Sequence, residues 1–171
     1  MLGGNYLRVR DSCLTAIFLA DLQPSKRLPR LLDLERGSGI RHPDYLTHLP
    51  LTASFFTGEG SPISSGIKRF VTEQMSPIRP VPTSGSVNSW ANKNVGLVAM
   101  SYIYSCEAEG YQTCPMEGYD SIRIKELLNI PERYEVAMAV ATGKGEGGGG
   151  TERYDFGEVF FNGTFGEEID V

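Results

Sequence analysis

The chain has 171 residues, of which 40% are apolar and 22% charged, and its formal net charge is −5. These values are ordinary for a globular protein that buries a core, so we expect one domain over residues 1–171. The acidic balance argues against a nucleic-acid or anionic-membrane binder, because no basic arm or stripe is visible. No apolar run reaches the ~18 residues that a membrane span requires.

The three cysteines, Cys13, Cys106 and Cys114, lie far apart and form no C-x-x-C pair. Their odd number and spacing argue against a disulfide framework or a zinc site. A reducing compartment is therefore the default, and we expect a cytoplasmic protein.

The first half of the chain predicts one strand and two helices. Residues 14–20 form a continuous apolar run, typical of a strand buried on both faces. Residues 24–36 predict a short helix with proline in its first turn. Residues 37–57 are punctuated by glycine and proline and show no clear period, whereas residues 64–75 predict another helix.

A long helix is predicted over residues 89–109, after a loop rich in proline, serine and glycine at residues 76–89. Apolar residues recur along this helix at i, i+3, i+4 and i+7 spacing and extend almost all round it. Gly110 is a suitable residue to end it. A helix with so little polar face is expected to be central in its fold.

Residues 113–120 (TCPMEGYD) contain proline, glycine and aspartate between apolar segments, and therefore predict a tight loop that presents backbone N–H groups. A second helix over residues 121–129 and an apolar strand over residues 134–141 follow. Residues 143–150 are rich in glycine, and residues 151–171 form an acidic tail with an aromatic patch.

The glycine-rich segment does not fit a phosphate-binding P-loop, because its lysine comes early and no apolar helix follows. It also lacks the helix of a dinucleotide fingerprint, so we interpret it as a linker. The only histidines, His42 and His48, form no metal or Ser/His/Asp constellation with other residues. Cys114 remains an open alternative as a nucleophile, although no base lies near it in sequence. Arg153 is either a solvated charge or a phosphate ligand.

The order of these segments resembles the C-terminal half of the FMN-dependent nitroreductase family, with the best match over residues 84–165. The resemblance includes Trp90 at the start of the long helix, the TCPMEGYD segment, and the short helix and strand after it. It implies an α+β, three-layer fold with a central mixed sheet flanked by helices. It also implies a homodimer that binds FMN between its subunits.

The resemblance further implies that hydride passes from NAD(P)H through FMN to nitroaromatics, quinones or similar small-molecule acceptors. The cofactor-binding positions that it implies are Pro115, Met116, Glu117, Gly118 and Arg153. Glu117 and Gly118 match positions whose backbone faces the flavin ring, and Arg153 matches an arginine that binds the FMN phosphate.

Two motifs of the family's N-terminal part are not found, namely an Arg-x-Ser-x-Arg phosphate motif and a flavin segment. Arg8-Val9-Arg10 is expected to be too close to the first strand to replace the former. Thr151 stands where a basic residue is often found, and Lys144 is a second candidate for the phosphate. We therefore expect an N-terminally truncated member, or alternatively a divergent, non-catalytic binding or partner subunit of the same fold.

Overall fold

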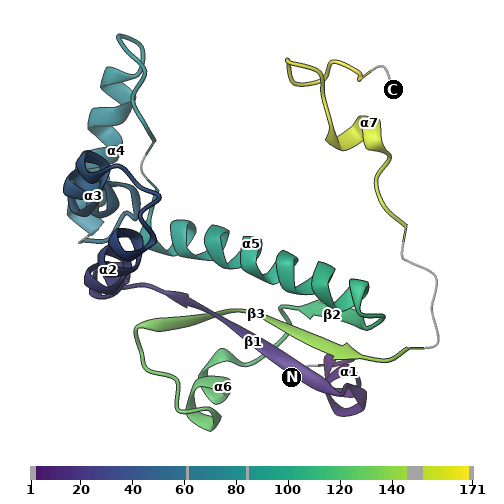
Figure 1. The fold of residues 1–171 in the computed structure, drawn as a ribbon. Helices are drawn as coiled ribbons and strands as arrows, with labels where there is room; N and C mark the ends of the chain where they lie inside the picture. The colour runs from purple at the N-terminus through teal and green to yellow at the C-terminus, as the bar shows by residue number, and fades with distance from the viewer. Residues whose placement is uncertain (1–2, 61, 84, 146–151, 170–171) are drawn as a thin grey trace.

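A computed structural model describes residues 3–60, 62–83, 85–145 and 152–169. It shows a small antiparallel sheet covered by helices (Figure 1). In chain order the elements are α1 (Asn5–Asp11), β1 (Leu14–Asp21), the 3₁₀ helix η1 (Pro24–Arg27), α2 (Leu28–Ser38), α3 (Pro43–Phe56), α4 (Pro62–Met75), α5 (Val87–Ala108), β2 (Gln112–Met116), α6 (Ser121–Leu127), β3 (Tyr134–Gly143) and α7 (Phe156–Val159).

The last strand in sequence, β3, lies at the centre of the sheet, whose order is β1-β3-β2. Both neighbours pair with it antiparallel, and Thr142 faces Leu14 on one side and Thr113 on the other. The expected strands at residues 14–20 and 134–141 are confirmed. The expectation that the first strand is buried on both faces is wrong, because β1 is an edge strand with only Ala20 buried. The described strands are also all antiparallel, where we expected a mixed sheet.

Helix α5 covers one face of the sheet (Figure 1). Ala91 and Ala99 are buried and, because their side chains are small, let the helix approach the strands closely. The Tyr102 hydroxyl lies 2.7 Å from Thr142 Oγ1, and its ring meets Phe18 edge-on. The long central helix predicted from the sequence is therefore confirmed.

The opposite face packs against α1 and the segment before α6. Met116, Ala139 and Ala141 form a buried cluster there. Val9 of α1 and Tyr119 pack against this cluster. Helices thus flank the sheet on both sides, which confirms the expected α+β architecture in three layers.

The helices predicted at residues 24–36, 64–75 and 121–129 are found, although the first divides into η1 and α2. Helix α3 was missed, because Pro50 stands inside it and its apolar residues form no clear stripe. His42 precedes α3 and its Nδ1 accepts a hydrogen bond from the Asp44 N–H. Within the described ranges, no helix combines the length and apolar character needed to cross a membrane.

The loop predicted over residues 113–120 is shorter than expected, because Gln112–Met116 pairs with β3 as strand β2. Only Glu117–Asp120 forms the connection to α6. Of the glycine-rich segment, residues 146–150 lie outside the described residues. The C-terminal segment 152–169, which includes α7, stands apart from the sheet and α5 (Figure 1).

Candidate functional site

The connection between β2 and α6, residues Glu117–Asp120, is called the turn below. Glu117 and Gly118 are exposed in it. The Tyr119 N–H donates to the Glu117 carbonyl oxygen at 2.9 Å, which folds the backbone tightly. Within the described ranges the Gly118 N–H has no hydrogen-bond acceptor. The turn therefore offers an accessible backbone donor to a ligand.

Three contacts from different elements fix the turn. The Tyr119 hydroxyl donates to the Val136 carbonyl oxygen of β3 at 2.8 Å. The Asp120 carboxylate caps α6 by accepting the Arg123 N–H at 3.1 Å. The Asn5 side-chain amide of α1 donates to the Gly118 carbonyl oxygen at 3.2 Å. A donor on such a fixed backbone is preorganised for a ligand.

The fold changes the pKa of Tyr119, which belongs to the turn. Burial raises the pKa of the Tyr119 phenol above its ordinary value, and the negative charges of Glu117 and Glu135 raise it further. The phenol therefore stays protonated and donates its hydrogen bond to Val136 throughout the neutral range.

Pro115 and Met116, the two predicted site residues that precede the turn, differ in burial and therefore in role. Pro115 is exposed on edge strand β2, where the missing N–H of proline is tolerated. Met116 is buried, at 4% exposure, in the cluster with Ala139 and Ala141. Its side chain therefore anchors the start of the turn in the core and does not point toward a ligand at the surface.

Arg153 is exposed in the C-terminal segment, and its Nη1 donates to the Glu152 carbonyl oxygen at 3.2 Å. This segment stands apart from the sheet (Figure 1). The structure thus brings Pro115, Met116, Glu117 and Gly118 together but does not bring Arg153 to them.

A second feature lies on the α1 side of the sheet, where β2 begins and β3 ends. This strand-end pocket has a volume of about 230 Å³. Its polar lining includes Arg8, Asp11, Ser12, Gln112, Thr113, Thr142 and Lys144. Sequence reasoning missed Asn5 at the turn and set Arg8 aside. Only the packing of α1 on the sheet, through Val9, shows where these two residues lie.

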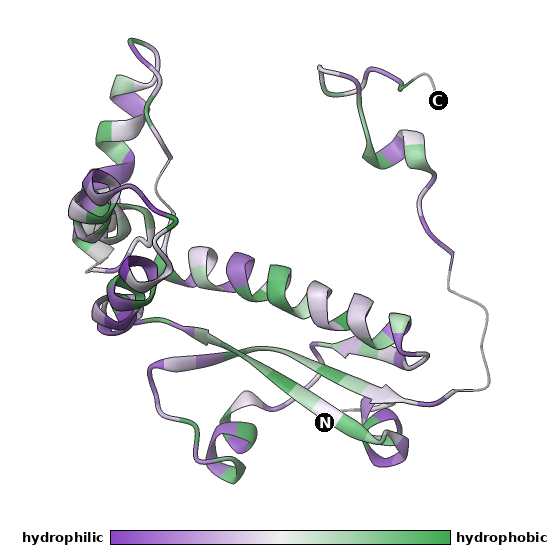
Figure 2. Cartoon of the chain, in the orientation of Figure 1, coloured by the Kyte–Doolittle hydropathy of each residue, from purple (hydrophilic) through white to green (hydrophobic). Residues whose placement is uncertain are grey.

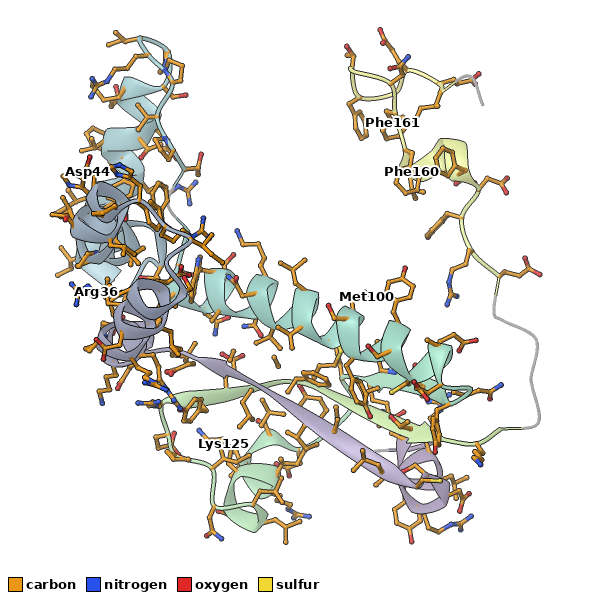
Figure 3. The ribbon with its side chains drawn as sticks, in the orientation of Figure 1. Arg36, Asp44, Met100, Lys125, Phe160 and Phe161 are labelled. Carbon is orange, nitrogen blue, oxygen red and sulfur yellow. The ribbon has the colours of Figure 1, made fainter. Side chains whose placement is uncertain are left out.

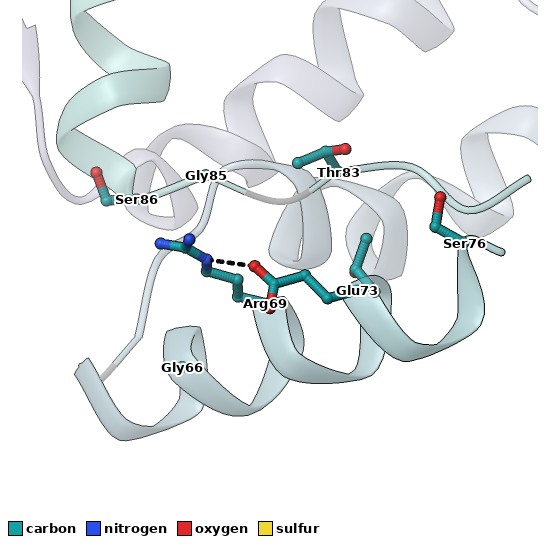
Figure 4. Close-up of a pocket in the computed structure, with 8 residues that line it drawn as sticks. Gly66, Arg69, Glu73, Ser76, Thr83, Gly85 and Ser86 are labelled. Atoms are coloured by element: carbon teal, nitrogen blue, oxygen red, sulfur yellow. Dashed lines mark hydrogen bonds and ion pairs between the residues drawn. The ribbon is translucent and has the colours of Figure 1, made fainter.

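A larger hollow of about 690 Å³ lies between α4 and the segment before α5 (Figure 4). Arg69 and Glu73 line it and form an ion pair at 2.8 Å. The described lining of the hollow comes from α4 and from Ser76, Thr83, Gly85 and Ser86, and includes no residue of the turn.

The part of the chain that contains the turn is similar in sequence to known proteins. Residues 80–144 match the Nitroreductase family. MhqN of Bacillus subtilis (strain 168) is 41% identical over 54 residues, which are 32% of this chain and 26% of MhqN. DrgA of Synechocystis is 33% identical over 54 residues, with the same coverage. The matches thus span about a quarter of the length of these curated relatives.

Solved structures share the fold over most of the chain. A nitroreductase family protein from Streptococcus pneumoniae TIGR4 superimposes with a TM-score of 0.65 at 17% identity, covering 94% of this chain and 70% of that one. A protein from Exiguobacterium sibiricum 255-15, solved in complex with FMN, has a TM-score of 0.61 at 19% identity and covers 92% and 65%. The similarity to the nitroreductase fold that the sequence indicated is therefore confirmed.

Replacing Tyr119 with phenylalanine tests how the turn is held. Because the folded-state pKa of Tyr119 is raised, its contribution to stability is complete below the ordinary pKa near 10 and is lost as the pH rises through the folded-state value. Tyr119→Phe is expected to lower the free energy of unfolding by about 1 kcal/mol at neutral pH and to flatten its decline at alkaline pH. Urea denaturation at a series of pH values from neutral to alkaline measures both effects. Tyr154→Phe, at a 78% exposed position, is the control, and an unchanged pH profile in Tyr119→Phe would contradict the assignment.

The contact between Asn5 and Gly118 is testable by a double-mutant cycle. A Cβ at Gly118 would lie 2.7 Å from Asn5 Nδ2, so Gly118→Ala forces the amide to move. The substitution is expected to cost about 1 kcal/mol in the native background, because it displaces the Asn5 amide from the Gly118 carbonyl, and clearly less in Asn5→Ala. Chemical denaturation gives the four stabilities. Gly157→Ala, where no atom lies within 4 Å, is the control, and equal costs in both backgrounds would refute the contact.

Proposed function

Since residues 80–144 belong to the nitroreductase family and the chain has the fold of that family, we propose that it acts as an FMN-dependent oxidoreductase. In this proposal hydride passes from NAD(P)H through the flavin to a nitroaromatic, a quinone or a similar small-molecule acceptor. The observation that carries the proposal is the turn, in which an exposed Gly118 N–H without an acceptor in the described ranges is fixed by contacts from α1, α6 and β3.

The donors that the turn presents fit a flavin ring. FMN, when bound, supplies the hydride chemistry through its isoalloxazine ring. The backbone at Glu117 and Gly118 would donate to the acceptor atoms on the N5 and O4 side of that ring. A backbone N–H does not titrate, so the turn polarises the ring without competing acid–base chemistry. Pro115 and Met116 precede these positions, and Met116 anchors them in the core.

The names of similar proteins support the cofactor and the reductant. The Exiguobacterium structure was solved with FMN, and the name of MhqN classes it with the NAD(P)H nitroreductases. For the phosphate of FMN, Arg153 is the candidate that the sequence resemblance provides. Its guanidinium is exposed and geometrically suited to phosphate oxygens.

Helix α5 supports the proposal of a homodimer, because one of its faces is apolar and uncovered. Leu97, Val98 and Tyr104 are 71%, 61% and 67% exposed. Met100 lies on the side of α5 turned away from the sheet (Figure 3), and the hydropathy colouring shows apolar segments along the helix (Figure 2). An apolar face of this kind on a central helix is typical of an interface. A second copy of the chain would cover it.

One observation favours the alternative of a non-catalytic member of the same fold. Arg153 lies in the segment that stands apart from the turn, so the structure does not assemble the expected phosphate ligand with the ring-facing residues. Such a protein would retain the fold and a partner surface without turning over NAD(P)H.

Flavin uptake and turnover separate these possibilities. The purified chain is expected to take up added FMN, with the visible absorption bands of a bound flavin, and to oxidise NADH or NADPH when a nitroaromatic or a quinone is present. Absence of FMN uptake would refute the proposed function, whereas uptake without NAD(P)H oxidation would support the alternative. Cys114→Ala is expected to keep the full rate, because no step uses this thiol.

A charge on the uncovered face of α5 tests the homodimer. Leu97→Glu is expected to raise the dimer dissociation constant at least about tenfold, because a buried carboxylate without a partner opposes association. Ile122→Glu, at a 70% exposed position on α6, is the matched control and should leave the dimer intact. Analytical ultracentrifugation measures both. A monomeric native protein, or a Leu97→Glu variant that dimerises normally, would contradict the proposed interface.

A further inference from the structure

We propose that the strand-end pocket is the phosphate-binding end of the flavin site, with Arg8 and Lys144 as the ligands of the FMN phosphate. The inference rests on the proposed function and extends it. Arg8 lies outside the segment that matches the family, and the sequence alone set it aside as too close to the first strand.

The charges lining the strand-end pocket favour an anion. Arg8 and Lys144 both line it, and neither forms an ion pair with a carboxylate among the described residues. Among the described lining residues the one acidic group, Asp11, is already paired with Arg10 at 2.6 Å. Ser12, Gln112 and Thr113 add neutral polar groups. Two cations without carboxylate partners and several polar side chains suit a phosphate dianion.

The chain reversal after α1 explains why Arg8 reaches this pocket. The Ser12 hydroxyl donates to the Val9 carbonyl oxygen at 2.9 Å, and the Cys13 N–H donates to the Thr142 carbonyl oxygen at 2.9 Å. These bonds fold α1 back over the end of β3. Closeness to the first strand, which argued against Arg8 in the sequence, is therefore what places it at the pocket.

Local packing also holds Lys144 beside the pocket. Its ammonium lies 5.9 Å from the centroid of the Tyr111 ring, a cation–π arrangement. At the next residue, a Cβ on Gly145 would lie 2.1 Å from Gln112 Oε1. The Gln112 side chain therefore lies against the backbone directly after Lys144.

The spacing between the turn and the pocket fits one FMN molecule. Strand β2 links them, and from Gln112, which lines the pocket, to Met116, which precedes the turn, it spans roughly 13 Å at about 3.3 Å per residue. Helix α1 links them independently, since Asn5 contacts the turn and Ser12 lines the pocket, roughly 10 Å apart at about 1.5 Å per residue. An extended ribityl chain with its terminal phosphate bridges a span of this order. Arg8 also donates to Asn5 Oδ1 at 2.8 Å, which connects the two ends.

Comparison of FMN with riboflavin isolates the phosphate contribution, because the two ligands differ only in that group. The native chain is expected to bind FMN at least about tenfold more tightly than riboflavin, as charge-assisted contacts provide. Arg8→Gln and Lys144→Gln should each reduce this preference several-fold. Lys144→Gln should leave riboflavin affinity unchanged, whereas Arg8→Gln also removes the hydrogen bond to Asn5, which contacts the turn. Flavin fluorescence quenching measures both affinities. Inorganic phosphate should compete with FMN but not with riboflavin.

Controls separate the local effect from net charge and from folding. Lys26→Gln and Arg30→Gln remove the same charge at exposed positions outside the pocket and should keep the native preference. Circular dichroism checks that each variant folds, and Lys144→Gln tests the pocket without touching the Arg8–Asn5 contact. Equal binding of FMN and riboflavin by the native chain, or an unchanged preference in both pocket variants, would overturn the phosphate assignment alone. Failure to bind either flavin would overturn the proposed function together with it.

Discussion

The pairing of β3 on both of its edges is the constraint on which the described structure depends. Its hydrogen bonds to β1 and β2 bring residues from the beginning, middle and later part of the chain into one sheet. Its residues Ala139 and Ala141 face α1, while Val140 is fully buried. Small and β-branched side chains on β3 thus let helices pack on both faces. The candidate site is built from segments that this strand brings together.

The turn and the strand-end pocket are the two ends of the short edge strand β2. At one end the Tyr119 hydroxyl fixes the turn to Val136 of β3, and at the other end Thr142 pairs with Thr113. Because β2 is held in register along its length, the two ends keep a fixed separation. Helix α1 spans the same distance on the opposite face from α5, and so contributes residues to both ends. The proposed ring contact and phosphate contact therefore follow from one piece of secondary structure.

The elements that depend on a local sequence pattern were predicted correctly from the sequence. The apolar period identified α5, the proline and glycine signals located the turn, and the resemblance selected Glu117 and Gly118. The position of β1 at an edge was not predictable, because an apolar run does not show whether a strand has one neighbour or two. Asn5 and Arg8 were not predictable either, since a helix of seven residues has little periodic signal and only tertiary packing shows its partners. The assignment of Arg153 to the FMN phosphate stays a prediction, because the C-terminal segment that contains it stands apart from the turn (Figure 1).

The brevity of α1 has a consequence for motion at the turn. Seven residues do not sustain a helix in water without tertiary contacts, so α1 persists only while Val9 stays docked on the sheet. When α1 undocks, Asn5 releases the Gly118 carbonyl and Arg8 leaves the strand-end pocket in the same event. The two ends of the candidate site therefore belong to one local unfolding unit, whose stability is that of the docked helix.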